Sequence, residues 1–144
     1  MKIAIASGKG GTGKTTVAVN FALSIPNSVY IDCDVEEPNG NLLLNPTIAA
    51  EYKSVKKIPK VNLESCGFCG KCSKVCEFNA ITVLKDDVIV FEEMCHSCGV
   101  CSFFCSREAI TETEKETGVI RTGYVQDELL SFIDGKLNIG EMAA

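Results

Sequence analysis

The sequence predicts an α/β protein in which a parallel-sheet unit is interrupted by a smaller α+β insertion. Three observations predict this organisation. A short apolar run at the amino terminus leads into a glycine-rich loop and an apolar segment. A second apolar run ends in Asp32-Cys33-Asp34, and eight cysteines form two matching sets farther along the chain. Alternating strands and helices are typical of parallel sheets, whereas matched cysteine sets are typical of a separate metal-binding unit.

The composition excludes several classes of protein. The chain has 144 residues, 46% of them hydrophobic and 23% charged, which is typical of a globular protein. No apolar run reaches the ~18 residues of a membrane-spanning helix. The 19 acidic against 14 basic side chains argue against a nucleic-acid partner. The apolar stretch at the amino terminus is too short for a secretory signal, so we expect a cytoplasmic protein whose cysteines serve metal or redox chemistry rather than disulfides.

The amino-terminal segment predicts a phosphate-binding loop. We expect residues 2–6 to form a buried parallel strand and residues 17–25, before Pro26, to form a buried helix. Between them, Gly8 to Thr15 matches G-x-x-x-x-G-K-[ST], a loop whose backbone N–H groups and following helix bind phosphates. A chance match in a glycine-rich turn is the alternative, which the strand and helix context disfavours. The expected nucleotide-binding residues are Gly8, Lys9, Gly10, Gly11, Thr12, Gly13, Lys14, Thr15 and Thr16.

This loop indicates ATP and Mg²⁺ as cofactors. Lys14 would neutralise phosphate charge, the Thr15 hydroxyl would ligate Mg²⁺, and Thr16 would support the α-phosphate. The segment from Lys9 to Thr16, Lys-Gly-Gly-Thr-Gly-Lys-Thr-Thr, resembles the deviant Walker A motif of the MinD/ParA/nitrogenase-iron-protein ATPases. The resemblance implies that Lys9 reaches the nucleotide held by a facing subunit, so that ATP joins two protomers.

A second strand is expected at residues 29–31, ending in two carboxylates. Such groups at the carboxyl end of a parallel strand lie where open α/β sheets place ligand chemistry. By the same resemblance, Asp34 looks like the switch residue that orients the attacking water, and Asp32 looks like a magnesium-side partner. Residues 35–39, Val-Glu-Glu-Pro-Asn, depart from the Pro-Gln-Gly-Asn of ParA proteins. We interpret Cys33 as a small buried strand residue rather than a redox thiol. The candidate catalytic residues are Asp34, Lys9 and Lys14.

Eight of the nine cysteines form a repeat. Each set reads C-x2-C-x2-C-x3-C, and the sets start at Cys66 and Cys95, 29 residues apart. The same offset relates Ala80-Ile81 to Ala109-Ile110, which suggests two duplicated halves that pack on each other. In this bacterial spacing three thiolates surround one iron–sulfur cluster, and the fourth, at the start of a short helix that leads away, ligates the other cluster.

The spacing therefore predicts two [4Fe–4S] clusters. Zinc is the alternative, because paired C-x2-C knuckles are common zinc ligands, but a third cysteine two residues on, repeated, favours iron–sulfur. Residues 59–113 resemble the bacterial two-cluster ferredoxins, although Glu77 and Ser106 stand where that family usually has proline. We assign one cluster to Cys66, Cys69, Cys72 and Cys105, and the other to Cys95, Cys98, Cys101 and Cys76.

Between the two cysteine sets, residues 81–84 and 88–91 are expected to form a β-hairpin. His96 is the single histidine, and we interpret it as a loop residue near the second cluster rather than a ligand, because eight thiolates already suffice.

The whole chain resembles MinD-superfamily ATPases that contain an inserted ferredoxin domain. We expect an ATPase part at residues 1–58, the insertion at 59–113, and a return segment at 114–144. ATPase domains of this superfamily are longer, so we expect an amino-terminal part, with another chain or segment supplying the rest. A complete ATPase would need a second carboxylate strand, but we interpret Asp134, which precedes Gly135, as a turn residue rather than that carboxylate.

Three functions remain open from the sequence. The first is an ATP-binding iron–sulfur protein that couples nucleotide binding or hydrolysis to electron transfer or cluster delivery, with ATPase activity if the remaining half is supplied. The second is a ferredoxin-like electron carrier on a remnant scaffold, and the third is a scaffold for cluster assembly. The expected partners are a nucleotide, a redox protein, and a second copy or a chain that completes the ATPase domain.

Overall fold

The computed structural model describes residues 1–125 and 129–141, and these fall into two compact units. The first unit comprises residues 1–53 and 118–138, and the second comprises 54–117 together with the described residues from Ile139 onward. The strands β2 (Thr47–Val61) and β5 (Ile110–Val125) each run from one unit into the other. Among the described residues, no helix is long and apolar enough to cross a membrane.

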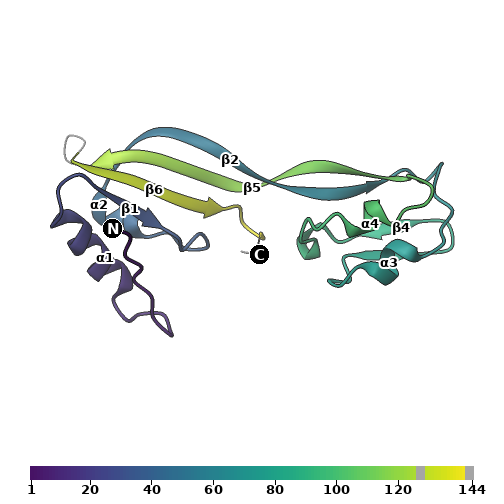
Figure 1. Ribbon diagram of the computed structural model, residues 1–144, viewed down its shortest axis with the longest axis horizontal. Coiled ribbons are helices and arrows are strands. Elements are labelled where there is room, and N and C mark those ends of the chain that lie inside the picture. Colours follow the sequence, from purple (N-terminus) through teal and green to yellow (C-terminus); the bar gives the residue numbers. More distant parts are fainter. Residues whose placement is uncertain (126–128, 142–144) are drawn as a thin grey trace. The chain divides into compact units, whose positions relative to one another are not determined.

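A four-stranded sheet of order β1-β6-β5-β2 forms the first unit (Figure 1). β1 (Ser28–Asp32) and β6 (Leu130–Leu137) are parallel, whereas β6 and β5 are antiparallel. The sheet is therefore mixed: the prediction of a parallel sheet is confirmed for the β1–β6 pair and wrong for the β6–β5 pair. The reason lies in the insertion: β2 leads to the second unit and β5 returns from it, so these neighbouring strands run in opposite directions.

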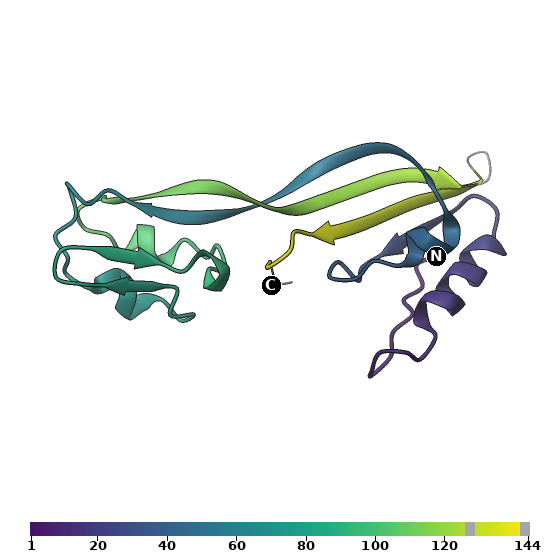
Figure 2. The ribbon, with the colours of Figure 1, turned by 180° about the vertical axis from the view of Figure 1, so that it is seen from behind.

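Two helices pack beside the sheet and complete the hydrophobic core of this unit. α1 (Lys14–Leu23) and α2 (Gly40–Leu44) lie beside β1, as the views from both sides show (Figures 1 and 2). The rings of Tyr30 and Phe132 stack with centroids 5.9 Å apart. Apolar side chains from both helices and from β5 and β6 surround them, and burial of this apolar area is the main stabilising term. The core consists of Val19, Ala22, Tyr30, Leu44, Val125, Leu130 and Phe132.

The amino-terminal strand expected at residues 2–6 is absent: these residues are exposed and have no regular secondary structure. A parallel strand needs a hydrogen-bonded neighbour, and none of the described strands pairs with this segment. The helix after the loop exists, but the prediction that it is buried is wrong. Only Val19 and Ala22 of α1 are buried, whereas Val17 and Phe21 are exposed, because one face alone packs on the sheet.

Two further interpretations of single residues are wrong. Asp134 is not a turn residue: it lies inside β6, opposite Asp32 of β1, and is 1% exposed. Its carboxylate accepts hydrogen bonds from Arg121 of β5, with Nε at 2.9 Å, so a cross-strand ion pair keeps it within the strand. Cys33 is exposed and follows the end of β1 instead of lying buried within it.

The second unit consists of a small hairpin and short helices. β3 (Ile81–Val83) pairs antiparallel with β4 (Val88–Val90), which confirms the expected hairpin. α3 (Lys71–Val75), a 3-10 turn (Glu92–Met94) and α4 (Val100–Phe103) carry or flank the cysteines. The fourth cysteine of each set does not begin a helix as expected, because α3 ends before Cys76 and α4 ends before Cys105.

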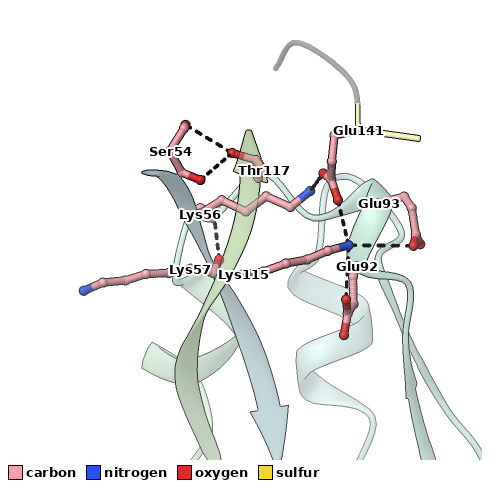
Figure 3. A network of polar contacts seen from close by, with 9 residues as sticks. Ser54, Lys56, Lys57, Glu92, Glu93, Lys115, Thr117 and Glu141 are labelled. Atoms are coloured by element: carbon pink, nitrogen blue, oxygen red, sulfur yellow. Dashed lines mark hydrogen bonds and ion pairs between the residues drawn. The ribbon is translucent and has the colours of Figure 1, made fainter. Parts of the chain in front are cut away.

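A group of charged side chains joins four segments of the second unit: β2, the 3-10 turn, β5 and the residues after Ile139 (Figure 3). The Lys115 ammonium lies 2.8 Å from Glu141 Oε1 and 3.2 Å from Glu92 Oε2, and Lys56 lies 2.9 Å from Glu141 Oε2. The Glu141 side chain is only 8% exposed. The two lysines lower the pKa of Glu141, and the hydrogen bond to Glu141 raises the pKa of Lys115. Glu93 Oε1 lies 3.9 Å from the Lys115 ammonium. We call Lys56, Glu92, Glu93, Lys115 and Glu141 the Lys115 network.

Candidate functional site

Eight thiols of the second unit surround two cavities. The first cavity contains about 410 Å³ of empty space, part of it open to solvent, and the second about 400 Å³. Each is lined by three cysteines of one repeat and the last cysteine of the other. The first cavity is lined by Cys66, Cys69, Cys72 and Cys105, and the second by Cys95, Cys98, Cys101 and Cys76. The structure thus brings the thiols together in the two groups of four that the sequence analysis assigned.

The two cysteine loops have the same backbone conformation at equivalent positions of the repeat. Phe68 and Ser97, 29 residues apart, both take a left-handed conformation, with φ of 49° and 55°. Asn79 and Glu108, which follow the fourth cysteines, do the same with φ of 53° and 49°. Left-handed backbone is unfavourable for side chains other than glycine, asparagine and aspartate, and such strain is concentrated at functional sites.

Backbone N–H groups point at the sulfur atoms. The amides of Ala80 and Ala109 donate to Cys76 Sγ and Cys105 Sγ, each at 3.3 Å, and the Phe68 amide donates to Cys66 Sγ at 3.4 Å. Amide donors stabilise negative charge on sulfur, as a bound metal also does.

Burial has the opposite effect on the thiols of the short helices. It is the largest cause that raises the pKa of Cys72 in α3 and of Cys101 in α4. Burial therefore disfavours the thiolate form of these two cysteines.

The thiols stand around each cavity rather than meeting at a point. Within residues 1–125 and 129–141, no three His, Cys, Asp or Glu side chains lie close enough together to bind a single metal ion. A mononuclear zinc site requires four ligand atoms within ~2.3 Å of one ion.

The side chains that complete the two cavities differ. In the second cavity, the rings of Phe78 and His96 stack with centroids 3.8 Å apart. His96 is an exposed loop residue between Cys95 and Cys98. In the first cavity the two equivalent positions hold Arg107 and Gly67, and the Arg107 side chain packs against that glycine. Sequence reasoning missed Arg107, although the 29-residue offset that relates it to Phe78 could have found it.

In the first unit, the glycine-rich loop lies at the amino terminus of α1. Gly13 precedes the helix with φ of 86°, and Gly11 has φ of 73°, conformations that favour glycine. The Ser7 hydroxyl donates to the Lys9 carbonyl at 2.8 Å and accepts from the Thr12 hydroxyl at 2.8 Å. The loop residues 8–13 are exposed, while Lys14 and Thr15 of the first helical turn are half-buried. The remaining loop residue of the prediction, Thr16, is exposed on the same turn.

The two carboxylates at the end of β1 lie in different surroundings. Asp32 is buried, and its oxygens accept hydrogen bonds from the amides of Gly40 at 2.9 Å and Asp34 at 3.1 Å. The Tyr30 hydroxyl donates to Asp32 at 3.4 Å, and burial together with this carboxylate raises the pKa of Tyr30 to about 12. Asp34 is exposed and accepts from the Glu37 amide at 3.4 Å. Asp32 therefore organises the chain between β1 and α2, whereas Asp34 is accessible to a ligand.

Comparison with known proteins places the chain in context. Residues 3–135 match the CbiA family, described as the CobQ/CobB/MinD/ParA nucleotide binding domain. An uncharacterized protein of Methanocaldococcus jannaschii is 43% identical over 145 residues, which cover 98% of this chain and 50% of that protein. A second uncharacterized protein of the same organism is 31% identical over 104 residues, covering 65% of this chain and 35% of its own length. The chain thus spans half or less of the length of these relatives.

Proposed function

Because this chain belongs to the CobQ/CobB/MinD/ParA family of nucleotide-binding domains, we propose that it is the nucleotide-binding and iron–sulfur part of an ATP-dependent redox protein. In this proposal the first unit binds ATP and Mg²⁺, and the second holds two [4Fe–4S] clusters. The nucleotide state of one unit controls electron transfer, or cluster delivery, by the other.

The observation that carries the iron–sulfur part is the grouping of thiols around the two cavities. Four cysteine sulfurs, shared between the repeats, supply the complete ligand set of one cubane in each cavity. The amide donors to Cys66, Cys76 and Cys105 support this assignment. Each cluster, when bound, would supply one-electron redox chemistry, while the protein positions the sulfurs.

The nucleotide part rests on family membership and on the loop itself. Backbone N–H groups of the loop and the amino terminus of α1 would bind the phosphates, with Lys14 neutralising charge and Thr15 ligating Mg²⁺. We propose that Lys9 contacts the nucleotide of a second protomer and that Asp34, which is exposed at the end of β1, orients the attacking water. This chain spans half the length of the first relative. In this proposal, ATP hydrolysis also requires residues from the half that the chain does not cover.

The first experiment tests the clusters. The full chain, purified without oxygen, should contain about eight iron and about eight acid-labile sulfide atoms, and its visible absorption should bleach on reduction by dithionite. Zinc at about one ion per cavity, or protein without iron or sulfide, would overturn the iron–sulfur assignment.

The second experiment tests the nucleotide site and separates the alternatives. Lys14→Ala should weaken Mg²⁺–ATP binding roughly 10- to 100-fold, because a charge-assisted contact is worth about 1.5–3 kcal/mol. Lys2→Ala is the matched control, since Lys2 is an exposed lysine of the same segment outside the motif. If Lys14→Ala leaves ATP affinity unchanged, the protein is a simple electron carrier. If the clusters move rapidly to an apo-acceptor and ATP does not change the rate, it is an assembly scaffold.

A further inference from the structure

The two cavities share one backbone but carry different charges. Among the side chains that line the first cavity, Arg107 and Lys71 are positive. The positions 29 residues away in the repeat hold Phe78 and Val100, which are uncharged and line the second cavity. The duplicated unit is therefore symmetric in its thiols and asymmetric in electrostatics.

The position of Arg107 is set by a second difference between the repeats. A Cβ atom on Gly67 would lie 2.6 Å from Arg107 Nε, so the guanidinium occupies space that only glycine leaves free. In the second cavity His96 stands at the equivalent position and stacks on Phe78 instead. Gly67 and Arg107 of the first cavity thus correspond to the aromatic pair His96 and Phe78 of the second.

The charges of the second cavity nearly cancel. Lys57 and Glu112 both line it, and Glu112 Oε1 accepts a hydrogen bond from the Ser102 hydroxyl at 3.4 Å. The Lys57 side chain points away from the Lys115 network, as Figure 3 shows, and is exposed. The lining of the second cavity carries one positive and one negative side chain, whereas the lining of the first carries two positive ones.

Reduction adds one electron to whatever occupies a cavity. A fixed positive charge close by stabilises the reduced form. Arg107 and Lys71 are both exposed, so water and salt reduce the size of this attraction but not its sign. Arginine keeps its charge at every pH at which the protein is folded, so its effect does not depend on titration.

From this asymmetry we infer that Arg107 and Lys71 give the first cavity the higher reduction potential, so that a single electron resides there before the second cavity is reduced. The inference rests on the iron–sulfur function proposed above. The electron enters from a protein donor of low potential, reaches the pair of clusters, and is held at the first cavity until an acceptor removes it. Arg107 and Lys71 are therefore potential-setting residues rather than ligands.

The test is a redox titration of the full chain with both clusters present, followed by absorption and electron paramagnetic resonance. Arg107→Gln should lower the higher midpoint potential and leave the lower one nearly unchanged, so that the gap between them narrows. Lys71→Gln should do the same, and because Lys71 is exposed this variant does not disturb packing. Arg107→Lys should retain most of the gap, because it keeps the charge. Lys74→Gln, an exposed lysine of α3 that lines neither cavity, is the control and should move neither midpoint.

A substitution in the second cavity provides an independent test of the same inference. Glu112→Gln removes the negative side chain of the second cavity and should raise the lower midpoint, which also narrows the gap. An unchanged gap in Arg107→Gln and Lys71→Gln, or a fall of the lower midpoint in place of the higher, would overturn the inference while leaving the clusters in place. Loss of all iron from the wild-type chain would instead contradict the proposed function itself, so the two failures are distinguishable.

Discussion

The two units of this protein differ in how far their functional residues depend on distant parts of the chain. In the second unit, all eight thiols lie between residues 66 and 105, and short loops and one-turn helices place them around both cavities. In the first unit, the loop at residues 8–13 is exposed, and the segment before it pairs with none of the described strands. Cysteine spacing thus sets its own local geometry, whereas a phosphate loop depends on the sheet around it.

The surface of the first unit shows the same dependence. β1 buries Tyr30 but leaves Val29 and Ile31 56% and 58% exposed, so its second face has no cover among the described residues. Strands of parallel sheets are normally covered on both faces. The stability of the first unit therefore rests on one face of the sheet, while bound metal would contribute directly to the stability of the second.

The largest expected effect is a loss of iron, and it follows because each cavity takes its fourth cysteine from the other repeat. Cys76→Ser should lower the iron content from about eight to about four atoms per chain, because it removes one thiol from the second cavity and none from the first. Chemical iron analysis and absorption spectra measure this. Cys33→Ser is the control, since Cys33 lines neither cavity. Full iron retention in Cys76→Ser would contradict the sharing of thiols between the repeats.

A change in the first unit tests whether the two units are independently stable. Arg121→Met removes the partner of Asp134, which is 1% exposed, and leaves a buried carboxylate unpaired. We expect a loss of about 3–5 kcal/mol in the unfolding free energy of the first unit, measured by hydrogen exchange in β1 and β6. The visible absorption of the clusters should persist.

The matched control for this variant removes both charges. The double change Arg121→Met with Asp134→Leu should recover much of the lost stability, because no unpaired charge then remains in the sheet. Loss of cluster absorption together with the first unit would show that the two units unfold as one, and the comparison between them would fail.

Much of the second unit could be predicted from sequence because its signals are local. The spacing of the cysteines and the turn residues between positions 81 and 91 each concern contacts within a few residues. The prediction of a buried strand at residues 2–6 failed because apolar character alone does not supply a hydrogen-bonding neighbour. Asp134 was misread because Asp-Gly is a local turn signal. The partner that keeps it in a strand, Arg121, comes from another strand.

The difference in charge between the two cavities could be predicted from the sequence only in part. The offset of the repeat places Phe78 opposite Arg107 in the alignment of the two halves, so the difference in charge was readable. What the sequence could not show is that Arg107 packs on Gly67, since this contact joins residues 40 positions apart. Pairs of this kind follow from the way the two repeats pack, which spacing alone does not determine.

A smaller effect is expected in the Lys115 network. Glu141→Gln should weaken the attachment of its segment to the second unit by about 1 kcal/mol, a roughly five-fold rise in hydrogen exchange near residues 139–141 at pH 7. The pKa of Glu141 is lowered in the folded protein, so its contribution is complete above the ordinary value of 4.5 and is lost as the pH falls through the lower folded value. The exchange rates of wild type and variant should therefore converge at acid pH.

Glu114→Gln, at an exposed position next to Lys115, is the control for this prediction. Equal hydrogen exchange in wild type and Glu141→Gln at pH 7 would show that the Lys115 network does not stabilise this segment.

The smallest effect should come from Tyr30→Phe. The hydroxyl of Tyr30 makes only a long hydrogen bond to Asp32, which keeps two backbone amide donors, so we expect a loss below about 1 kcal/mol at pH 7. The pKa of Tyr30 is raised from 10.0 to about 12, so the contribution of its neutral form is complete below pH 10 and is lost as the pH rises toward 12. Thermal unfolding of the first unit, followed by circular dichroism between pH 8 and about 11, should therefore decline more steeply in wild type than in the variant. Tyr52→Phe, at a side chain that is 57% exposed, should leave that slope unchanged. Parallel curves for wild type and Tyr30→Phe would show that Asp32 is held by backbone amides alone, and that β1 depends on its neighbours even more than the core packing indicates.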